Sequence, residues 1–175
     1  MHNNGNQFNA KKISLSGILA ALTVMTLFLA TTMPTSRLSL YALSSFFVSI
    51  IIIEFGVKAG WVFYISSLLL ALIVVQNKVG LIPYGLFFGV YGVAKFYIEK
   101  ADNIILEYIL KIVYFNIFII VSVLLIKEFF LDSVRVDFSW WIVILGAEAI
   151  FVIYDYVYTR FIQYYNAKLR QILKI

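Results

Sequence analysis

The stretch SLSGILAALTVMTLFLATTMPTSRLSLYALSSFFVSIIIIEF, residues 14–55, consists of two long apolar runs separated by a short polar break. Pro34 lies inside the break. Because proline has no backbone N–H and disfavours helix in the residue before it, a helix is expected to end here. Arg37 is the only charged residue between Lys12 and Glu54. The stretch therefore predicts two apolar helices joined by a tight polar turn with one arginine.

The composition of the whole chain is typical of a membrane protein. Of its 175 residues, 63% are hydrophobic and 13% are charged, whereas a soluble domain carries about 25% charged residues. In a membrane protein the net charge of +5 reflects cationic cytoplasmic loops rather than a nucleic-acid partner. We therefore expect an all-α, polytopic protein of the bacterial plasma membrane, embedded in the lipid bilayer.

Six segments approach the roughly 20 apolar residues that a membrane-spanning helix needs. We expect a flexible tail over residues 1–12, followed by a single domain that extends to residue 175. Gly56 is expected to end the second helix, and Asp102 or Asn103 to cap the fifth. The six predicted transmembrane helices cover residues 13–33, 38–55, 57–75, 80–98, 104–126 and 140–161.

The distribution of lysine and arginine predicts the orientation of this six-helix bundle. If the N-terminus is cytoplasmic, ten of the 14 basic residues fall on the cytoplasmic side. Cytoplasmic loops of membrane proteins carry an excess of these residues. Both termini are therefore expected in the cytoplasm, with the break around Arg37 outside.

A few polar side chains fall within the predicted helices, where burying an ionisable group is costly. Glu148 and Asp155 are seven residues apart and share one helix face, and Asn116 lies at similar depth. One interpretation gives the two carboxylates a functional role. In the other, they pair with Lys95 or Lys111, or are protonated, and only hold helices together.

Two further pairs have the spacing of neighbours on a helix surface. Lys95 lies four residues before Glu99, and Glu107 lies four residues before Lys111. Such pairs stabilise a helix modestly. We expect a structural role, with the two lysines reaching toward the cytoplasmic surface.

Small residues follow one another at four-residue spacing along the first helix. They form two pairs, Ser16 with Ala20 and Gly17 with Ala21. Small residues at this spacing allow another helix to approach closely. The neighbour is either another helix of this chain or a partner membrane subunit.

The sequence contains no pattern for catalysis or metal binding. It has no cysteine and a single histidine, His2, and it lacks a phosphate-binding glycine loop and a nucleophile elbow. We therefore expect neither enzymatic activity nor a metal or cofactor.

Three segments together resemble the substrate-binding S component of energy-coupling factor (ECF) vitamin transporters. They are the first helix from Leu15 to Leu22, the loop from Pro34 to Leu40, and the turn from Glu54 to Gly60. In that family the first helix typically docks on a transmembrane coupling subunit through an Ala-x-x-x-Ala motif. The strict alanine pair is absent here, and Gly17 with Ala21, or Ser16 with Ala20, would take its place.

The resemblance also implies a binding site and partners. The family holds a substrate in the outer half of the bundle, under the loop between the first two helices, and ATPase subunits drive uptake. A flat heteroaromatic or vitamin-like nutrient is implied. The residues expected near it are Thr35, Ser36, Arg37, Tyr41, Tyr84, Trp140 and Glu148.

Two other functions remain open at this stage. One is a membrane scaffold of the six-helix rod-morphogenesis type, with the small residues as partner interfaces. The other is a stand-alone proton-coupled carrier that uses Glu148 and Asp155 as a relay, although the helices show no inverted halves.

Overall fold

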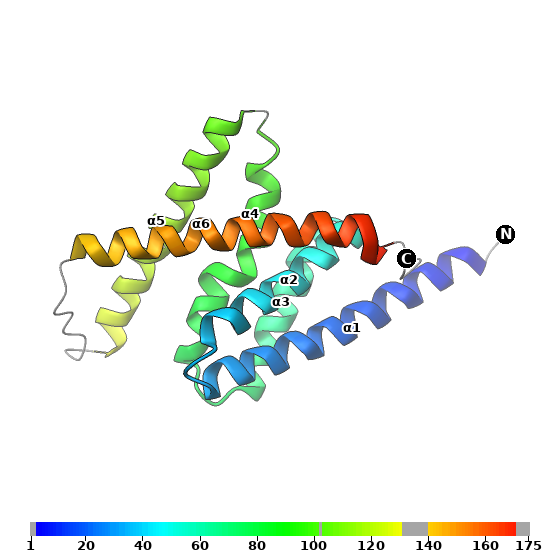
Figure 1. Cartoon of the computed structure of the whole chain (residues 1–175). Helices are drawn as coiled ribbons and strands as arrows, with labels where there is room; N and C mark the ends of the chain where they lie inside the picture. The colour runs from blue at the N-terminus through cyan, green and yellow to red at the C-terminus, as the bar shows by residue number, and fades with distance from the viewer. Residues whose placement is uncertain (1–2, 102, 131–139, 171–175) are drawn as a thin grey trace.

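The computed structural model describes residues 3–101, 103–130 and 140–170, and this part of the chain is helical, without strands. The described residues form six α-helices, a 3-10 turn, η1, and two π-helical turns, η2 and η3. Figure 1 shows how the α-helices are arranged. The all-α prediction is confirmed. The elements are α1 (Asn3–Thr32), α2 (Arg37–Phe55), α3 (Val57–Val74), η1 (Val79–Leu81), η2 (Tyr84–Phe88), α4 (Gly89–Ile98), α5 (Ile104–Phe130), α6 (Trp140–Tyr164) and η3 (Tyr165–Leu169).

Five helical segments of the described chain are long and apolar enough to cross a membrane. They correspond to the first five of the six predicted helices. The sixth predicted helix is present as α6, which carries Glu148, Asp155 and Arg160 among its apolar residues. The five segments are Lys12–Thr32, Arg37–Phe55, Val57–Val74, Val79–Ile98 and Ile104–Leu124.

The break in the first hairpin lies where proline predicts it. α1 ends at Thr32 and α2 begins at Arg37. The other end of α1 differs from the expectation of a flexible tail, because the helix already begins at Asn3. Figure 1 shows this end extending beyond the other helices. No proline interrupts residues 3–12, so an established helix propagates outward at one hydrogen bond per residue.

Gly56 forms the corner between α2 and α3, as the sequence predicts. Its φ is +85°, a conformation that glycine adopts without steric cost. Its N–H donates to the carbonyl of Ile52 at 2.9 Å. At the other predicted cap, Asn103 Oδ1 accepts from the N–H of Ile105 at 3.0 Å at the start of α5, whereas Asp102 lies outside the described residues.

The fourth transmembrane segment is central and irregular. Half of its residues are buried, the largest share among the five segments. The sequence predicts one regular helix over residues 80–98, but the structure has a 3-10 turn, then Pro83, then the π-helical turn η2 before α4. Pro83 cannot donate a backbone hydrogen bond, and single π turns within helices are frequent at functional sites. Phe87 and Phe88 of this turn are buried.

α6 runs across the other helices (Figure 1) and is held to them by aromatic residues and hydroxyl groups. Tyr158 is fully buried and donates to the carbonyl of Ser45 in α2 at 3.2 Å. Phe151 stacks on Phe115 of α5, with ring centroids 4.5 Å apart. α6 therefore covers a surface formed by α2, α4 and α5.

Candidate binding cavity and the ion network beside it

A cavity of about 610 Å³ lies between the start of α2, the π-helical turn η2, the middle of α5 and α6. Its volume is in the range of sites that bind small molecules. The described residues that line it are Arg37, Leu38, Ser39, Tyr41, Ala42, Pro83, Phe87, Phe88, Phe115, Phe118, Ile119, Ala147, Ile150, Phe151, Ile153, Tyr154 and Val157.

Seven of the described residues that line the cavity are aromatic, and eight are aliphatic. Tyr41 and Phe88 stack with centroids 5.6 Å apart and planes inclined by 21°. Phe87 contacts Phe118 at 4.7 Å and Tyr154 at 5.7 Å between ring centroids. Rings offer large, rigid apolar surfaces and favour offset-stacked or edge-to-face contacts with other rings.

The two tyrosine hydroxyls of the wall are occupied by partners in the protein. Tyr41 donates to the carbonyl of Gly80, and Tyr154 donates to the hydroxyl of Ser45 at 2.9 Å. Consequently, these two residues present ring surface to the cavity, and their polar atoms stabilise the packing of α2 against η1 and α6.

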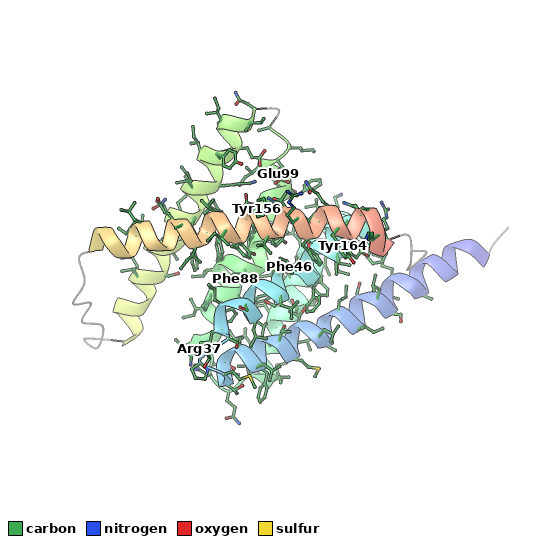
Figure 2. The ribbon with its side chains drawn as sticks, in the orientation of Figure 1. Arg37, Phe46, Phe88, Glu99, Tyr156 and Tyr164 are labelled. Carbon is green, nitrogen blue, oxygen red and sulfur yellow. The ribbon has the colours of Figure 1, made fainter. Side chains whose placement is uncertain are left out.

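Arg37 is the only charged residue among the described residues that line the cavity. It is exposed at the first position of α2, and its side chain has no hydrogen bond or ion pair with any part of the chain that the structure describes. Figure 2 shows it at the α1–α2 turn, with Phe88 deeper in the molecule. The cavity thus has an apolar body and one cationic end.

Of the residues predicted to bind substrate, Arg37 and Tyr41 line this cavity and four others do not. Thr35 and Ser36 are exposed in the α1–α2 turn. Tyr84 is fully buried and shares a hydrogen bond of 2.7 Å with Ser67 of α3. The fourth is Glu148. Trp140 begins α6, but its side chain lies outside the described part of the chain.

Glu148 is separated from the cavity by the geometry of its helix. Ala147, the preceding residue, lines the cavity, and successive residues of an α-helix are rotated by about 100°. The side chain of Glu148 instead accepts a hydrogen bond from Asn116 Nδ2 at 3.3 Å. The two polar groups predicted at similar depth in α5 and α6 are therefore partners.

Sequence reasoning missed most of the aromatic wall. A sequence pattern that could identify the lining residues is present in α6, where they recur at helical spacing. It is present in α5 as well, where Phe118 follows Phe115 by three residues. In an apolar chain these positions do not differ in composition from lipid-facing ones, so periodicity alone does not separate them.

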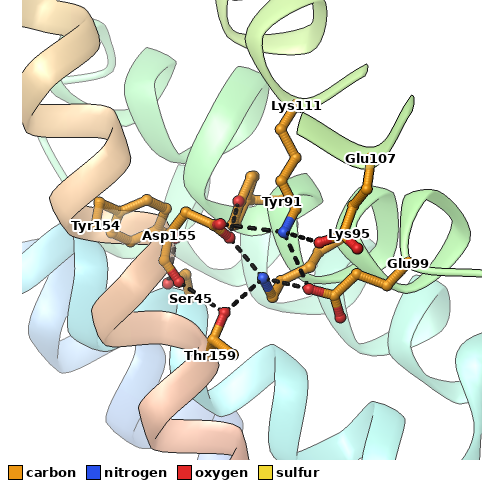
Figure 3. A network of polar contacts seen from close by, with 9 residues as sticks. All are labelled: Ser45, Tyr91, Lys95, Glu99, Glu107, Lys111, Tyr154, Asp155 and Thr159. Atoms are coloured by element: carbon orange, nitrogen blue, oxygen red, sulfur yellow. Dashed lines mark hydrogen bonds and ion pairs between the residues drawn. The ribbon is translucent and has the colours of Figure 1, made fainter. Parts of the chain in front are cut away.

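A second site, which is polar, lies between α4, α5 and α6 and is centred on Asp155 (Figure 3). Its Oδ1 is 2.5 Å from Lys95 Nζ, and its Oδ2 is 3.1 Å from Lys111 Nζ. Tyr91 also donates a hydrogen bond of 2.5 Å to Asp155. Of the two interpretations of the carboxylates, pairing with lysine holds for Asp155, which contacts both Lys95 and Lys111.

Two more carboxylates complete this ion network. Glu99 is 2.5 Å from Lys95 and 3.1 Å from Lys111, and Glu107 is 2.5 Å from Lys111. Both predicted four-residue pairs are therefore present, but Glu99 and Asp155 join them into one network. A smaller cavity of about 250 Å³ borders the network, and Phe151 lines both cavities.

The expectation that the two lysines reach the cytoplasmic surface is wrong. The side chain of Lys95 is 2% exposed and that of Lys111 is 4% exposed. Carboxylates on α4, α5 and α6 surround them, and paired charges with satisfied hydrogen bonds are the form in which lysine is tolerated inside a protein.

The small residues of α1 lie on two different faces of the helix. Gly17 and Ala21 are exposed, and a Cβ added at Gly17 would have no neighbour within 4 Å. Ser16 and Ala20 are partly buried, and Ala20 packs against the core. The pair Gly17 and Ala21 is therefore the one that a partner helix can reach.

Comparisons with known proteins give no match. No protein-family model matches the chain, and neither a curated protein nor a solved structure is significantly similar to it. Among the described residues, no group of three or more histidine, cysteine, aspartate or glutamate side chains is arranged to hold a metal ion.

Proposed function

We propose that this chain is the substrate-binding membrane subunit of an ECF-type importer, which captures a small nutrient from outside the cell. The observation that supports the proposal is the cavity of about 610 Å³ that is lined by seven aromatic residues and by Arg37. It lies next to the α1–α2 turn, which corresponds to the loop that covers the substrate in the S components the sequence resembles. The chain itself carries out no chemistry, and ATP is hydrolysed by partner subunits.

The proposal includes a position in the bacterial plasma membrane with both termini in the cytoplasm. The excess of basic residues on the predicted inner side supports this orientation. It places the Arg37 end of the cavity toward the exterior and the ion network toward the cytoplasm. The exposed face of α1 with Gly17 and Ala21 is then available to the transmembrane coupling subunit.

The geometry argues against the proton-coupled carrier. A relay carboxylate must exchange a proton readily, but Asp155 is held by two lysines at 2.5 and 3.1 Å. Glu148 accepts a hydrogen bond from Asn116, which belongs to α5 and not to the ion network. A membrane scaffold, for its part, has no need of an aromatic cavity.

Purification of the tagged chain from its native membrane tests this proposal. We expect an ATPase pair and a coupling subunit to be recovered with it, and proteoliposomes with all subunits to show ATP-dependent uptake. Gly17→Leu should reduce that recovery at least fivefold, because a large side chain keeps a partner helix away. Ile18→Leu, on the same exposed stretch of α1, is the matched control. Recovery of cell-wall enzymes in place of the ATPase pair would favour the scaffold.

A further inference from the structure

We infer that the cavity beside Arg37 binds a flat aromatic molecule that carries one anionic group, with its rings among the aromatic side chains and its charge at Arg37. The inference rests on the proposed function and specifies its substrate class. It replaces the broader expectation of a heteroaromatic nutrient with a molecule that has few hydrogen-bonding groups and one acid.

The described wall has few hydrogen-bonding side chains, and this argues against a highly polar ligand. Besides Arg37 they are Ser39, Tyr41 and Tyr154. The hydroxyls of Tyr41 and Tyr154 already donate to Gly80 and Ser45. Each polar group of a ligand that loses water without gaining a partner weakens binding in an apolar site. A solute with many ring nitrogens and hydroxyls would therefore bind poorly, whereas a hydrocarbon ring system loses little.

The charge of the ligand follows from Arg37. It is the one charged side chain on the described wall, and it has no partner there. The three carboxylates of the ion network belong to the neighbouring cavity and are already paired with Lys95 and Lys111. Guanidinium binds carboxylate in a planar, two-bonded arrangement, which is the strongest polar contact this cavity can supply.

Ring stacking favours a flat ligand over an acyl chain. Tyr41 lies on Phe88 and Phe115 lies on Phe151 in stacked pairs, so several ring planes already face one another around the cavity. A planar molecule adds to such a set with favourable offset geometry and loses little conformational entropy. A flexible acyl chain gains only apolar contact and loses the freedom of many bonds.

The test compares 2-naphthoate with 2-naphthamide, which have the same rings and differ in charge. Binding is measured by equilibrium dialysis against the full chain in phosphatidylcholine nanodiscs, with empty nanodiscs subtracted. Naphthoate is expected to bind at least tenfold more tightly than the amide. Equal affinities, or tighter binding of the amide, would overturn the assignment of charge.

Two variants locate the anionic group. In Arg37→Gln the preference for naphthoate over the amide is expected to fall at least fivefold, whereas the amide affinity stays within twofold. Lys58→Gln removes one positive charge at the start of α3, at the opposite end of α2 from Arg37, and should leave the preference unchanged. If both variants lower the preference for naphthoate equally, general electrostatic attraction explains that preference, and the assignment of the anionic group to Arg37 is wrong.

Palmitate and Phe118→Leu test the aromatic part. Palmitate has the same charge without rings and is expected to bind more weakly than naphthoate. Phe118→Leu keeps an apolar wall and should weaken naphthoate severalfold while leaving palmitate unchanged. Tighter binding of palmitate would assign the cavity to a lipid-like acid and overturn the aromatic assignment.

Failure of this inference and failure of the proposed function have different outcomes. If the ATPase pair is recovered and a neutral or cationic nutrient binds, the importer subunit stands and only the substrate class is wrong. If naphthoate binds at Arg37 but no ATPase pair is recovered and no uptake occurs, the site stands and the importer is wrong.

Discussion

At the scale of single residues, the buried charges of α4, α5 and α6 decide how the second half of the chain is held together. Asp155 contacts two lysines from two other helices, and each lysine has a further carboxylate partner. Removing one member of such a network leaves a buried charge without its counter-charge, which costs more than the network contributes when complete.

Asp155→Asn is expected to destabilise the protein by about 3 kcal/mol, because Lys95 and Lys111 then remain buried with one carboxylate fewer. Unfolding by a denaturing detergent, followed by circular dichroism, measures the change. Glu148→Gln is the comparison, since this side chain has a single described hydrogen bond, to Asn116. The Glu148→Gln variant should lose about 1 kcal/mol or less of its free energy of unfolding. Equal losses of unfolding free energy in the two variants would contradict a special role of the ion network in stability.

Tyr84 illustrates how burial separates a residue from a neighbouring cavity. Its ring is fully buried, and its hydroxyl shares a hydrogen bond with Ser67. Tyr84→Phe should cost about 1 kcal/mol of stability and leave ligand affinity unchanged in the dialysis assay. A loss of affinity in a stably folded variant would show that Tyr84 reaches the ligand.

At the scale of elements, the corners determine the path of the chain. α2 and α3 meet at Gly56, whose φ of +85° directs α3 back along α2. Pro83 and the π turn η2 change the course of the fourth segment where it lines the cavity. The aromatic wall therefore depends on an irregularity in a helix and not on a regular bundle.

Gly56→Ala is expected to destabilise the fold by about 1–2 kcal/mol through backbone strain alone, because an added Cβ there has nothing within 4 Å. The same detergent unfolding assay measures it. Gly17→Ala is the matched control. It also places a Cβ in open space, but within a regular helix, where alanine is favoured by about 1 kcal/mol. If both substitutions stabilise the protein, the corner is not strained.

At the scale of the whole molecule, five segments of the described chain are long and apolar enough to cross a membrane, and the ion-paired α6 packs against them. The orientation of these helices remains a prediction, and the chain is convenient for testing it because it contains no cysteine. Single cysteines introduced into exposed turns at opposite ends of α3 therefore report their side of the membrane directly.

Gln76→Cys, in the turn after α3, is expected to react in intact cells with a maleimide that does not cross membranes. Lys58→Cys, at the start of α3, should react only after permeabilisation. Both positions are exposed, so a difference in labelling reflects the side of the membrane. The reverse pattern would invert the topology and place the Arg37 end of the cavity in the cytoplasm.

The sequence by itself determined the helical class, the break after α1, the corner at Gly56 and the two four-residue ion pairs. Each depends on local properties: the length of an apolar run, the missing N–H of Pro34, the freedom of glycine, and helical spacing. Arg37 stood out for the same reason, as a lone charge in an apolar stretch.

Only the tertiary structure decided which polar and aromatic residues meet. Tyr84, Phe88 and Glu148 lie in equally apolar surroundings in the sequence. In the structure Tyr84 is buried away from the cavity, Phe88 lines it, and Glu148 pairs with Asn116. The union of Lys95, Lys111 and Asp155 likewise requires three helices to come together. In a chain this apolar, composition does not distinguish a core face from a lipid face, so the direction of each side chain is set by how the helices cross.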